Sequence, residues 1–261
     1  MKDVQQDKPE FSISIERVGV KDIKYPVRIL KKSNDYQHSV ATICMSVYLD
    51  KDSRGTHMSR FIETIEKYKS NINGPTLKDI LKDSIKIFDT TRAFIDISFP
   101  YFIEKRAPVS HQSSIMETTC GYKNEIIDGK ITTSLVVKVP VTTLCPCSKE
   151  ISDYGAHNQR AIVTLIAQEK EFVWFEDLID LIERSSSAPI YPLLKRKDEK
   201  FVTEQAYNNP RFVEDLVREI YNKINEKYKS KLSNIKITVE SDESIHTHKA
   251  FAIIEKEIKE K

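Results

Sequence analysis

Residues 41–49 read Ala-Thr-Ile-Cys-Met-Ser-Val-Tyr-Leu, and apolar side chains occupy every second position of this stretch. In an extended chain, successive side chains point to opposite faces, so alternate residues share a face. One face would therefore carry Ala41, Ile43, Met45, Val47 and Leu49. The stretch predicts a strand with one buried face, and the same period recurs at residues 93–99, 135–139 and 235–239.

Helical periodicity fills the intervals between these strands. Apolar residues spaced three or four apart form stripes over residues 61–68, 77–88, 178–182 and 213–224. Asn209 followed by Pro210 is a typical helix start, with a capping side chain before a proline, and it predicts where the last helix begins. In the same way, Ser59 is a candidate cap for the first helix.

The two halves of the chain repeat one order of elements. The first half predicts strands near 11–49, two helices near 59–89, and strands near 90–104 and 109–126. The second half predicts strands near 130–141 and 158–168, helices near 174–185 and 210–229, and strands near 234–241 and 249–257. Alternating strands favour antiparallel pairing with one face covered by helices. We therefore expect an α+β protein whose halves share one continuous sheet.

Composition restricts the class of protein. The chain has 261 residues, and 41 basic against 39 acidic residues give a net charge of +2. Proteins that coat nucleic acid usually carry a strong basic excess, so we expect no nucleic-acid partner. The first ten residues lack the apolar segment of a secretory signal, and no apolar run approaches the roughly 18 residues of a membrane span. We expect a cytoplasmic protein with no membrane partner, in which cysteines stay reduced.

The densest chemistry lies in Thr143-Leu-Cys-Pro-Cys-Ser-Lys-Glu150, followed by Tyr154-Gly-Ala-His-Asn-Gln-Arg160. Here a predicted strand delivers Cys145 and Cys147, and His157 follows 12 residues after the first thiol. Thiolate and imidazole are good zinc ligands, and a catalytic zinc site keeps one position open for water. A lone cysteine or histidine would more often be an ordinary buried group, but this concentration of ligand types favours a metal site.

Three other segments carry weaker signals. His246 and His248 lie two residues apart in Ser244-Ile-His-Thr-His248, so an extended segment would place both on one face. By its residues alone, the segment 195–204 reads as a charged, solvated loop. The segment 52–60 carries Arg54, His57 and Arg60 before a helix, where they could face an anion.

Together these segments resemble the type IB GTP cyclohydrolase I family. The matching stretches are RGTHMSRFIE, TTLCPCSKEISDYGAHNQR, DEKFVTEQAYNNPRFVEDLVR and ESIHTHKAFA, between residues 54 and 252. The family has the tunnelling fold, an antiparallel sheet backed by two helices. The resemblance implies two such units in tandem, residues 1–127 and 128–261, within one continuous structural domain. It also implies a homotetramer with active sites at subunit interfaces.

The resemblance extends to individual residues. It implies a divalent metal ion, zinc or manganese with iron as an alternative, and the ligands it implies are Cys145, His157, Glu199 and His246. Glu204 remains an alternative to Glu199, and either histidine of the SIHTH segment remains open as the ligand. One departure is Arg196-Lys-Asp-Glu-Lys200, where the family commonly has proline second, which should alter loop stiffness more than chemistry.

The implied substrate is GTP, and the implied reaction opens the guanine ring, releases formate and yields 7,8-dihydroneopterin triphosphate. His248 is the expected proton donor, because histidine titrates in the useful range. Cys147 is left open as ligand, acid or bystander. Glu214 would accept the N–H groups of guanine. The candidates for triphosphate binding, unranked, are Arg54, Lys149, Arg160 and Arg211.

Three alternatives stay open. An archaeal branch of the family uses iron and makes a cyclic phosphate product. A non-catalytic, zinc-stabilised binding protein would need a closed four-ligand site, whereas a mixed Cys/His/Glu set fits an open catalytic site better. A related tunnelling-fold enzyme acting on pterins or urate would lack the CPCSKE segment.

Overall fold

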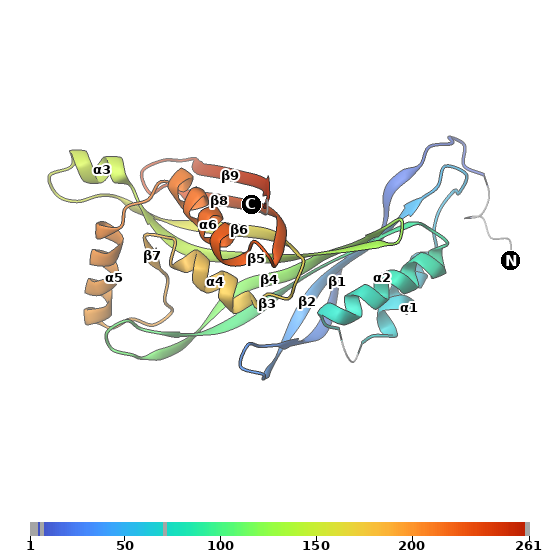
Figure 1. The fold of residues 1–261 in the computed structure, drawn as a ribbon, viewed down its shortest axis with the longest axis horizontal. Coiled ribbons are helices and arrows are strands. Elements are labelled where there is room, and N and C mark those ends of the chain that lie inside the picture. The colour runs from blue at the N-terminus through green and yellow to red at the C-terminus, as the bar shows by residue number, and fades with distance from the viewer. Residues whose placement is uncertain (1–4, 6–7, 70–71, 259–261) are drawn as a thin grey trace. The chain divides into compact units, whose positions relative to one another are not determined.

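The computed structural model describes residue 5, residues 8–69 and residues 72–258. Within them, nine strands form one sheet in the order β1-β2-β3-β4-β5-β6-β8-β9, and β7 pairs with β5 (Figure 1). The pairings β1–β2, β2–β3, β6–β8 and β8–β9 are antiparallel. The predicted α+β class is confirmed. None of the helices in the described part of the chain has the length and apolar character needed to cross a membrane.

The chain divides into two compact units that exchange segments. One comprises residues 1–100 and 121–134, and the other comprises residues 101–120 and 135–261. Strands β3 (Arg92–Arg106), β4 (Ser113–Ile127) and β5 (Lys130–Leu144) therefore contribute residues to both units. The expected pair of tandem tunnelling-fold units at 1–127 and 128–261 stays a prediction.

In the first unit, two helices pack beside the strands. The remaining elements are β1 (Ile15–Leu30), β2 (Tyr36–Leu49), α1 (Met58–Glu66) and α2 (Gly74–Phe88). The alternating residues of β2 are buried as predicted, with Ala41, Ile43, Met45 and Val47 at most 1% exposed and Leu49 partly exposed. The rings of Phe61 and Phe88 stack with centroids 4.2 Å apart and join the two helices.

The helix starts of the first unit differ from one another. Asn73 caps α2, because its side chain accepts a hydrogen bond from the backbone N–H of Thr76. The capping prediction for Ser59 is wrong: α1 begins at Met58, so Ser59 lies inside the helix. His57 occupies the cap position and makes no side-chain capping hydrogen bond.

The second unit repeats this architecture with additions. Its further elements are α3 (Pro146–Ile151), β6 (Asn158–Glu169), α4 (Phe175–Glu183), β7 (Ala188–Pro189), α5 (Arg196–Asn208), α6 (Val213–Tyr228), β8 (Leu232–Asp242) and β9 (Lys249–Glu257). Helices α4 and α6 lie side by side (Figure 1). Their predicted apolar stripes are buried. Relative to the predicted order, α3, β7 and α5 are extra.

Nearly all of segment 195–204 is helical, so its interpretation as a loop is wrong. Residues 196–204 belong to α5, which Lys195 precedes, and most residues of this helix are good helix formers. The helix buries Ala206 against Leu144 and Ala188, with Val202 packed beside them. Because it buries so narrow an apolar face, no amphipathic stripe marks it in the sequence.

The predicted start of the last helix is also wrong. Helix α6 begins at Val213, and Asn209 instead follows the last residue of α5. The side chain of Asn209 donates a hydrogen bond to the carbonyl oxygen of Ser186 at 2.8 Å. The side chain of Asn209 therefore binds a neighbouring loop and does not cap the first turn of α6.

Candidate metal and nucleotide site

Cys145 occupies the junction between a strand and a short helix. It follows the last residue of β5 and takes the cap position of α3, with Pro146 as the first helical residue. Its Sγ accepts a hydrogen bond from the backbone N–H of Ser148 at 3.4 Å. Proline suits the first helical position because the N–H that it lacks would have no partner within the helix. The sequence Cys-Pro thus ends the strand and presents the sulfur at the start of the helix.

The strand end before Cys145 is held on both sides. The backbone N–H of Leu144 donates to Ser187 Oγ at 3.2 Å, and its carbonyl accepts from the N–H of Arg211 at 3.0 Å. Ser187 also donates its own N–H to the carbonyl of Thr142 at 3.1 Å, beside the β5–β7 pairing. Buried backbone groups need such partners. Segments distant in sequence therefore hold the backbone of Leu144, the residue directly before Cys145.

His157 lies beside Cys145. The N–H of Cys145 donates to the carbonyl of His157 at 3.2 Å, and the N–H of His157 donates to Ser148 Oγ at 3.4 Å. Its imidazole is largely buried, with 15% of the side chain exposed. Nδ1 lies 3.0 Å from Gln159 Oε1 and 3.8 Å from Glu243 Oε2. Two side-chain oxygens, from Gln159 and Glu243, thus lie near Nδ1 of His157.

This pair fits a metal ion in its donor chemistry. With Gln159 Oε1 as the acceptor, a neutral ring would carry its hydrogen on Nδ1 and would keep the lone pair of Nε2 for a metal ion. Metal-binding histidines usually donate their second ring N–H in this way. Cys145 adds a thiol that forms no disulfide. A thiolate and an imidazole are both established zinc ligands.

The expected carboxylate ligand lies on α5. Glu199 is exposed on the first turn of that helix. The alternative, Glu204, is also exposed and forms an ion pair with Lys200 one turn earlier.

Asp198, the neighbour of Glu199, anchors the start of α5. It is fully buried and accepts hydrogen bonds from the N–H groups of Val109, Ser110 and Lys195 and from Ser110 Oγ, at 2.6–2.9 Å. Burial raises the pKa of this carboxyl, but the hydrogen bonds outweigh it and hold the pKa well below its ordinary value. The helix turn that carries Glu199 is therefore tied to the β3–β4 connection.

His246 and His248 lie together in the connection between β8 and β9. Their rings stack with centroids 5.0 Å apart and planes inclined by 17°, and both side chains are exposed. The N–H of His246 donates to the carbonyl of Glu243 at 3.1 Å. The two histidines share a face, as their spacing predicts, although the backbone here turns and does not continue the strand.

The four expected ligands are not gathered into one cluster in this single chain. Among the described residues, no group of three or more His, Cys, Asp or Glu side chains is arranged to hold a metal ion. The structure brings Cys145 together with His157 and His246 together with His248. Glu199 and Cys147 are both exposed.

The candidates for substrate binding lie in different settings. Glu214 is an exposed residue in the first turn of α6. Lys149 donates to the carbonyl of Tyr207 at 2.6 Å and lies over its ring. Arg211 lies 3.9 Å from Glu219 and is partly buried, whereas Arg160 is exposed on β6. Arg54 is exposed before α1 in the first unit.

Sequence reasoning missed Gln159 and Glu243. Gln159 lies two residues from His157 on an extended chain, a spacing that places both on one face. Glu243 immediately precedes the SIHTH segment, and the β6–β8 register, which pairs Arg160 with Asp242, brings it to the same end of β6. The first signal was available locally, whereas the second depends on a strand pairing that no local pattern specifies.

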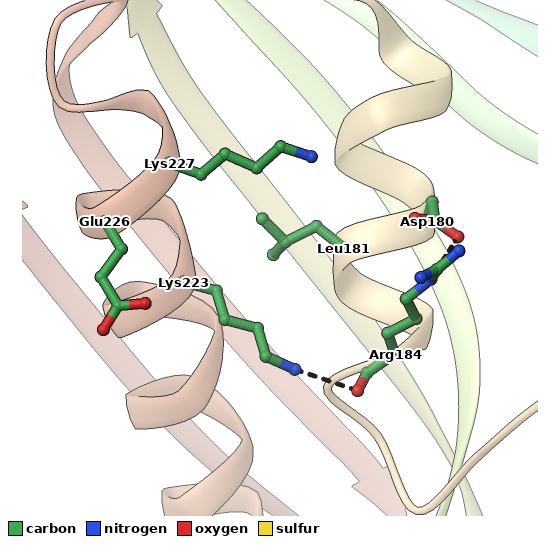
Figure 2. A pocket seen from close by; sticks show the side chains of 6 residues that line it. All are labelled: Asp180, Leu181, Arg184, Lys223, Glu226 and Lys227. Carbon is green, nitrogen blue, oxygen red and sulfur yellow. Dashed lines mark hydrogen bonds and ion pairs between the residues drawn. The ribbon is translucent and has the colours of Figure 1, made fainter.

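A cavity elsewhere in the second unit has a different character. About 430 Å³ in volume, it lies between α4 and α6 and is lined by Asp180, Leu181, Arg184, Lys223, Glu226 and Lys227 (Figure 2). Lys223 Nζ donates to the carbonyl of Arg184 at 3.0 Å and pairs with Glu219 at 3.0 Å. The guanidinium of Arg184 pairs with Asp180 at 2.8 Å. The cavity includes none of the candidate site residues, and two of its cations already have acidic partners.

Comparison with known proteins decides the family. A family model described as type I GTP cyclohydrolase folE2 matches residues 1–252. The chain belongs to the type I GTP cyclohydrolase folE2 family. It is 48% identical over 254 residues to GTP cyclohydrolase FolE2 of Fervidobacterium nodosum, with 97% of each chain covered. It is 49% identical over 260 residues to GTP cyclohydrolase FolE2 of Thermosipho melanesiensis, with 100% of each chain covered.

Solved structures extend the likeness of this GTP cyclohydrolase family member to the tunnelling fold. Uricase from Arthrobacter globiformis superposes with a TM-score of 0.55 at 9% identity, covering 94% of this chain and 93% of that one. Urate oxidase from Bacillus subtilis gives 0.54 at 10% identity, covering 94% and 98%. At such low identity the likeness concerns the fold alone. The predictions of a GTP cyclohydrolase and of the tunnelling fold are confirmed.

Proposed function

We propose that the chain catalyses the metal-dependent hydrolytic opening of the guanine ring of GTP, releasing formate and giving 7,8-dihydroneopterin triphosphate, as a type IB enzyme. Family membership supports GTP as the substrate. The observation that carries the metal dependence is the pairing of Cys145 with His157, whose Nδ1 already has an acceptor. This arrangement leaves a sulfur and one ring nitrogen available as ligands.

In this proposal, Cys145, His157, Glu199 and His246 hold a divalent ion, zinc or manganese with iron as an alternative. Such an ion would supply Lewis acidity, lowering the pKa of bound water to about 7. The mixed sulfur, nitrogen and oxygen set suits a catalytic ion, since structural zinc sites are usually richer in sulfur. A thiolate ligand also requires a reducing compartment, which favours the cytoplasm.

The other residues bind GTP and move protons. Glu214 accepts the N–H groups of guanine, and a charged acceptor makes these bonds stronger than a neutral one would. His248, stacked on His246, donates a proton to the purine ring nitrogen as the ring opens. The basic candidates for the triphosphate are Lys149, Arg160, Arg211 and Arg54. Cys147 is exposed near the sulfur ligand and is the remaining candidate acid.

The proposed assembly is a homotetramer whose active sites lie at subunit interfaces. Several proposed site groups, among them Cys147, Glu199 and Glu214, are exposed in the single chain, as groups completed by a neighbour would be. Strands β1 and β9 end the strand order within the described residues, and unpaired strand edges can associate with another chain. Phe251 and Ile253 expose apolar surface on β9.

The test is incubation of the chelator-treated protein with GTP, with and without added zinc, manganese or iron. Formate release and pterin fluorescence should appear only with a divalent ion. The mass of the product separates 7,8-dihydroneopterin triphosphate from a cyclic phosphate. Full turnover with chelator present would refute the metal dependence, and metal binding without turnover would indicate a binding protein.

A further inference from the structure

A glutamine next to the proposed metal site has a conspicuous position. Gln159 is the second residue of β6 and is only 8% exposed, although an amide side chain usually faces solvent. Its Oε1 lies 3.0 Å from His157 Nδ1, within hydrogen-bonding distance. The two residues are separated by one residue on an extended chain, so the backbone itself directs both side chains to one face.

The strand pairing brings a second acceptor to the same nitrogen. In the β6–β8 register, Ala161 pairs with Ser241 and Arg160 pairs with Asp242, which directs Glu243 toward the start of β6. Glu243 Oε2 lies 3.8 Å from His157 Nδ1, a distance suited to an electrostatic contact but longer than a hydrogen bond. Gln159 is therefore the direct hydrogen-bond partner of the ring.

This contact has a chemical consequence for the imidazole. A neutral histidine carries one ring hydrogen, and an amide oxygen accepts a hydrogen bond but cannot donate one. The hydrogen is therefore held on Nδ1, and Nε2 presents its lone pair on the far side of the ring. The amide also fixes the plane of the ring without adding a negative charge to the site.

We propose that Gln159 is a positioning residue, which holds His157 in the Nδ1–H tautomer and orientation needed for Nε2 to bind the metal ion. The proposal rests on the proposed function in one respect, that Cys145 and His157 are metal ligands. It assigns to Gln159 no contact with GTP or with the ion. Partners of this kind typically change metal affinity by 10–100-fold when they are removed.

The variants distinguish the loss of the hydrogen-bond acceptor from the loss of side-chain volume. Gln159→Leu keeps a similar volume and removes the oxygen, whereas Gln159→Asn keeps the amide but withdraws its oxygen by one methylene. Gln159→Glu keeps an acceptor in place. The matched control is Gln168→Leu, because Gln168 lies near the other end of β6, where its Oε1 accepts a hydrogen bond from Asn234.

The first measurement needs no metal. Two-bond ¹H–¹⁵N NMR of the metal-free protein reports which nitrogen of His157 carries the hydrogen. Wild type, Gln159→Glu and Gln168→Leu should show the Nδ1–H form. Gln159→Leu and Gln159→Asn should shift toward the Nε2–H form. An unchanged tautomer in both of these variants would overturn the proposal.

The second measurement is the dissociation constant for zinc or cobalt, taken beside the melting temperature. Affinity should fall roughly 10–100-fold in Gln159→Leu and recover in Gln159→Glu, while the control stays at the wild-type value. Unchanged affinity in folded Gln159→Leu would overturn the positioning role and leave the proposed function intact. Failure of the wild-type chain to bind either metal would overturn the proposed metal site itself.

Discussion

At the scale of single residues, two thiols two positions apart occupy different environments. Cys145 closes a strand, accepts a hydrogen bond from Ser148 and lies against His157. Cys147 lies inside the first turn of α3 with its side chain exposed. The proposed roles of the two thiols, ligand and candidate acid, can therefore be tested separately.

Replacing each thiol by alanine should separate these roles. Cys145→Ala should lose bound metal and GTP turnover together, because it removes a proposed ligand. Cys147→Ala should retain more metal. Metal content per chain and formate release, measured on both variants, test the assignment. Equal loss of metal in the two variants would contradict it.

Glu214 offers a second prediction at this scale. As the acceptor for guanine, Glu214→Gln would place an N–H where the purine also presents one. An unsatisfied buried group costs roughly 1–3 kcal/mol, so kcat/KM for GTP should fall at least about tenfold. The exposed position on α6 implies a change in stability below about half a kcal/mol.

The measurement for Glu214→Gln is kcat/KM beside metal content and melting temperature. Glu226→Gln is a suitable control, because Glu226 lies on the same helix and lines the cavity between α4 and α6. Near-native kinetics in Glu214→Gln would exclude a role in recognising guanine.

Residue spacing predicted part of the candidate site. Cys145 and His157 were marked by their ligand types, and the structure places them together. Gln159 could have been found from its spacing to His157. Glu243 could not, because its position depends on which strand pairs with β6 and in which register. Buried sheets fix register through packing, and local sequence does not reveal it.

At the scale of elements, much of the proposed site lies on or beside α3, β7 and α5, the three elements that are additional to the order shared by the two halves. Helix α3 contains Cys147 and Lys149, and α5 contains Glu199. Strand β7 pairs with β5 just before Cys145. Among its described residues, the first unit has two helices between its strand pairs and none of these additions. Sequence periodicity found the shared elements and missed the added ones, because the latter bury few apolar residues.

The anchor of α5 leads to a prediction on stability and pH. The depressed pKa of Asp198 means that its carboxylate stabilises the fold above the unfolded value of about 3.9, and this contribution is lost as pH falls. Asp198→Asn should lower the melting temperature at pH 7. The difference from wild type should shrink as pH falls below about 4.

Asp180→Asn supplies the control for Asp198, because Asp180 is exposed and pairs with Arg184 one turn away, a contact worth little. A melting-temperature difference for Asp198→Asn that stays constant from pH 7 to pH 3 would contradict the role given to its carboxylate. Zinc affinity, measured in parallel, reports whether the start of α5 also positions Glu199.

At the scale of the whole molecule, a buried ion pair joins distant parts of the chain. Lys105 Nζ on β3 donates to Glu183 Oε2 at the end of α4 at 2.6 Å, and both residues are at most 8% exposed. Burial raises the pKa of Glu183, and Lys105 only partly offsets that effect. The ring of Tyr191 lies 4.7 Å from the same ammonium group.

Removing the lysine should destabilise the fold strongly. Lys105→Met leaves a buried carboxylate without its cation, a change that costs about 3–5 kcal/mol. Urea unfolding at pH 7 should show this loss, and the loss should shrink at lower pH as Glu183 takes up a proton. Arg106→Met, at the exposed neighbouring position, should stay within about half a kcal/mol. Equal effects of the two substitutions would contradict the role of the pair.

The sequence predicted the architecture better than its details. The repeated order of strands and helices is confirmed, because long amphipathic elements carry strong periodic signals. The start of α6 was misplaced, since Asn209 bonds to a loop 23 residues earlier, a choice made by tertiary contacts. Such contacts regularly override local capping signals.

The exchange of segments between the compact units restricts where the chain can be divided into fragments that fold. The second unit includes residues 101–120, and these supply Tyr101 to Glu176, Lys105 to Glu183 and Ser110 to Asp198. A gene fragment encoding only residues 128–261 would leave three acidic side chains without these donors. Although the halves share an order of elements, a cut at their midpoint would separate these donors from their acceptors, so we expect neither half to fold by itself as a stable domain.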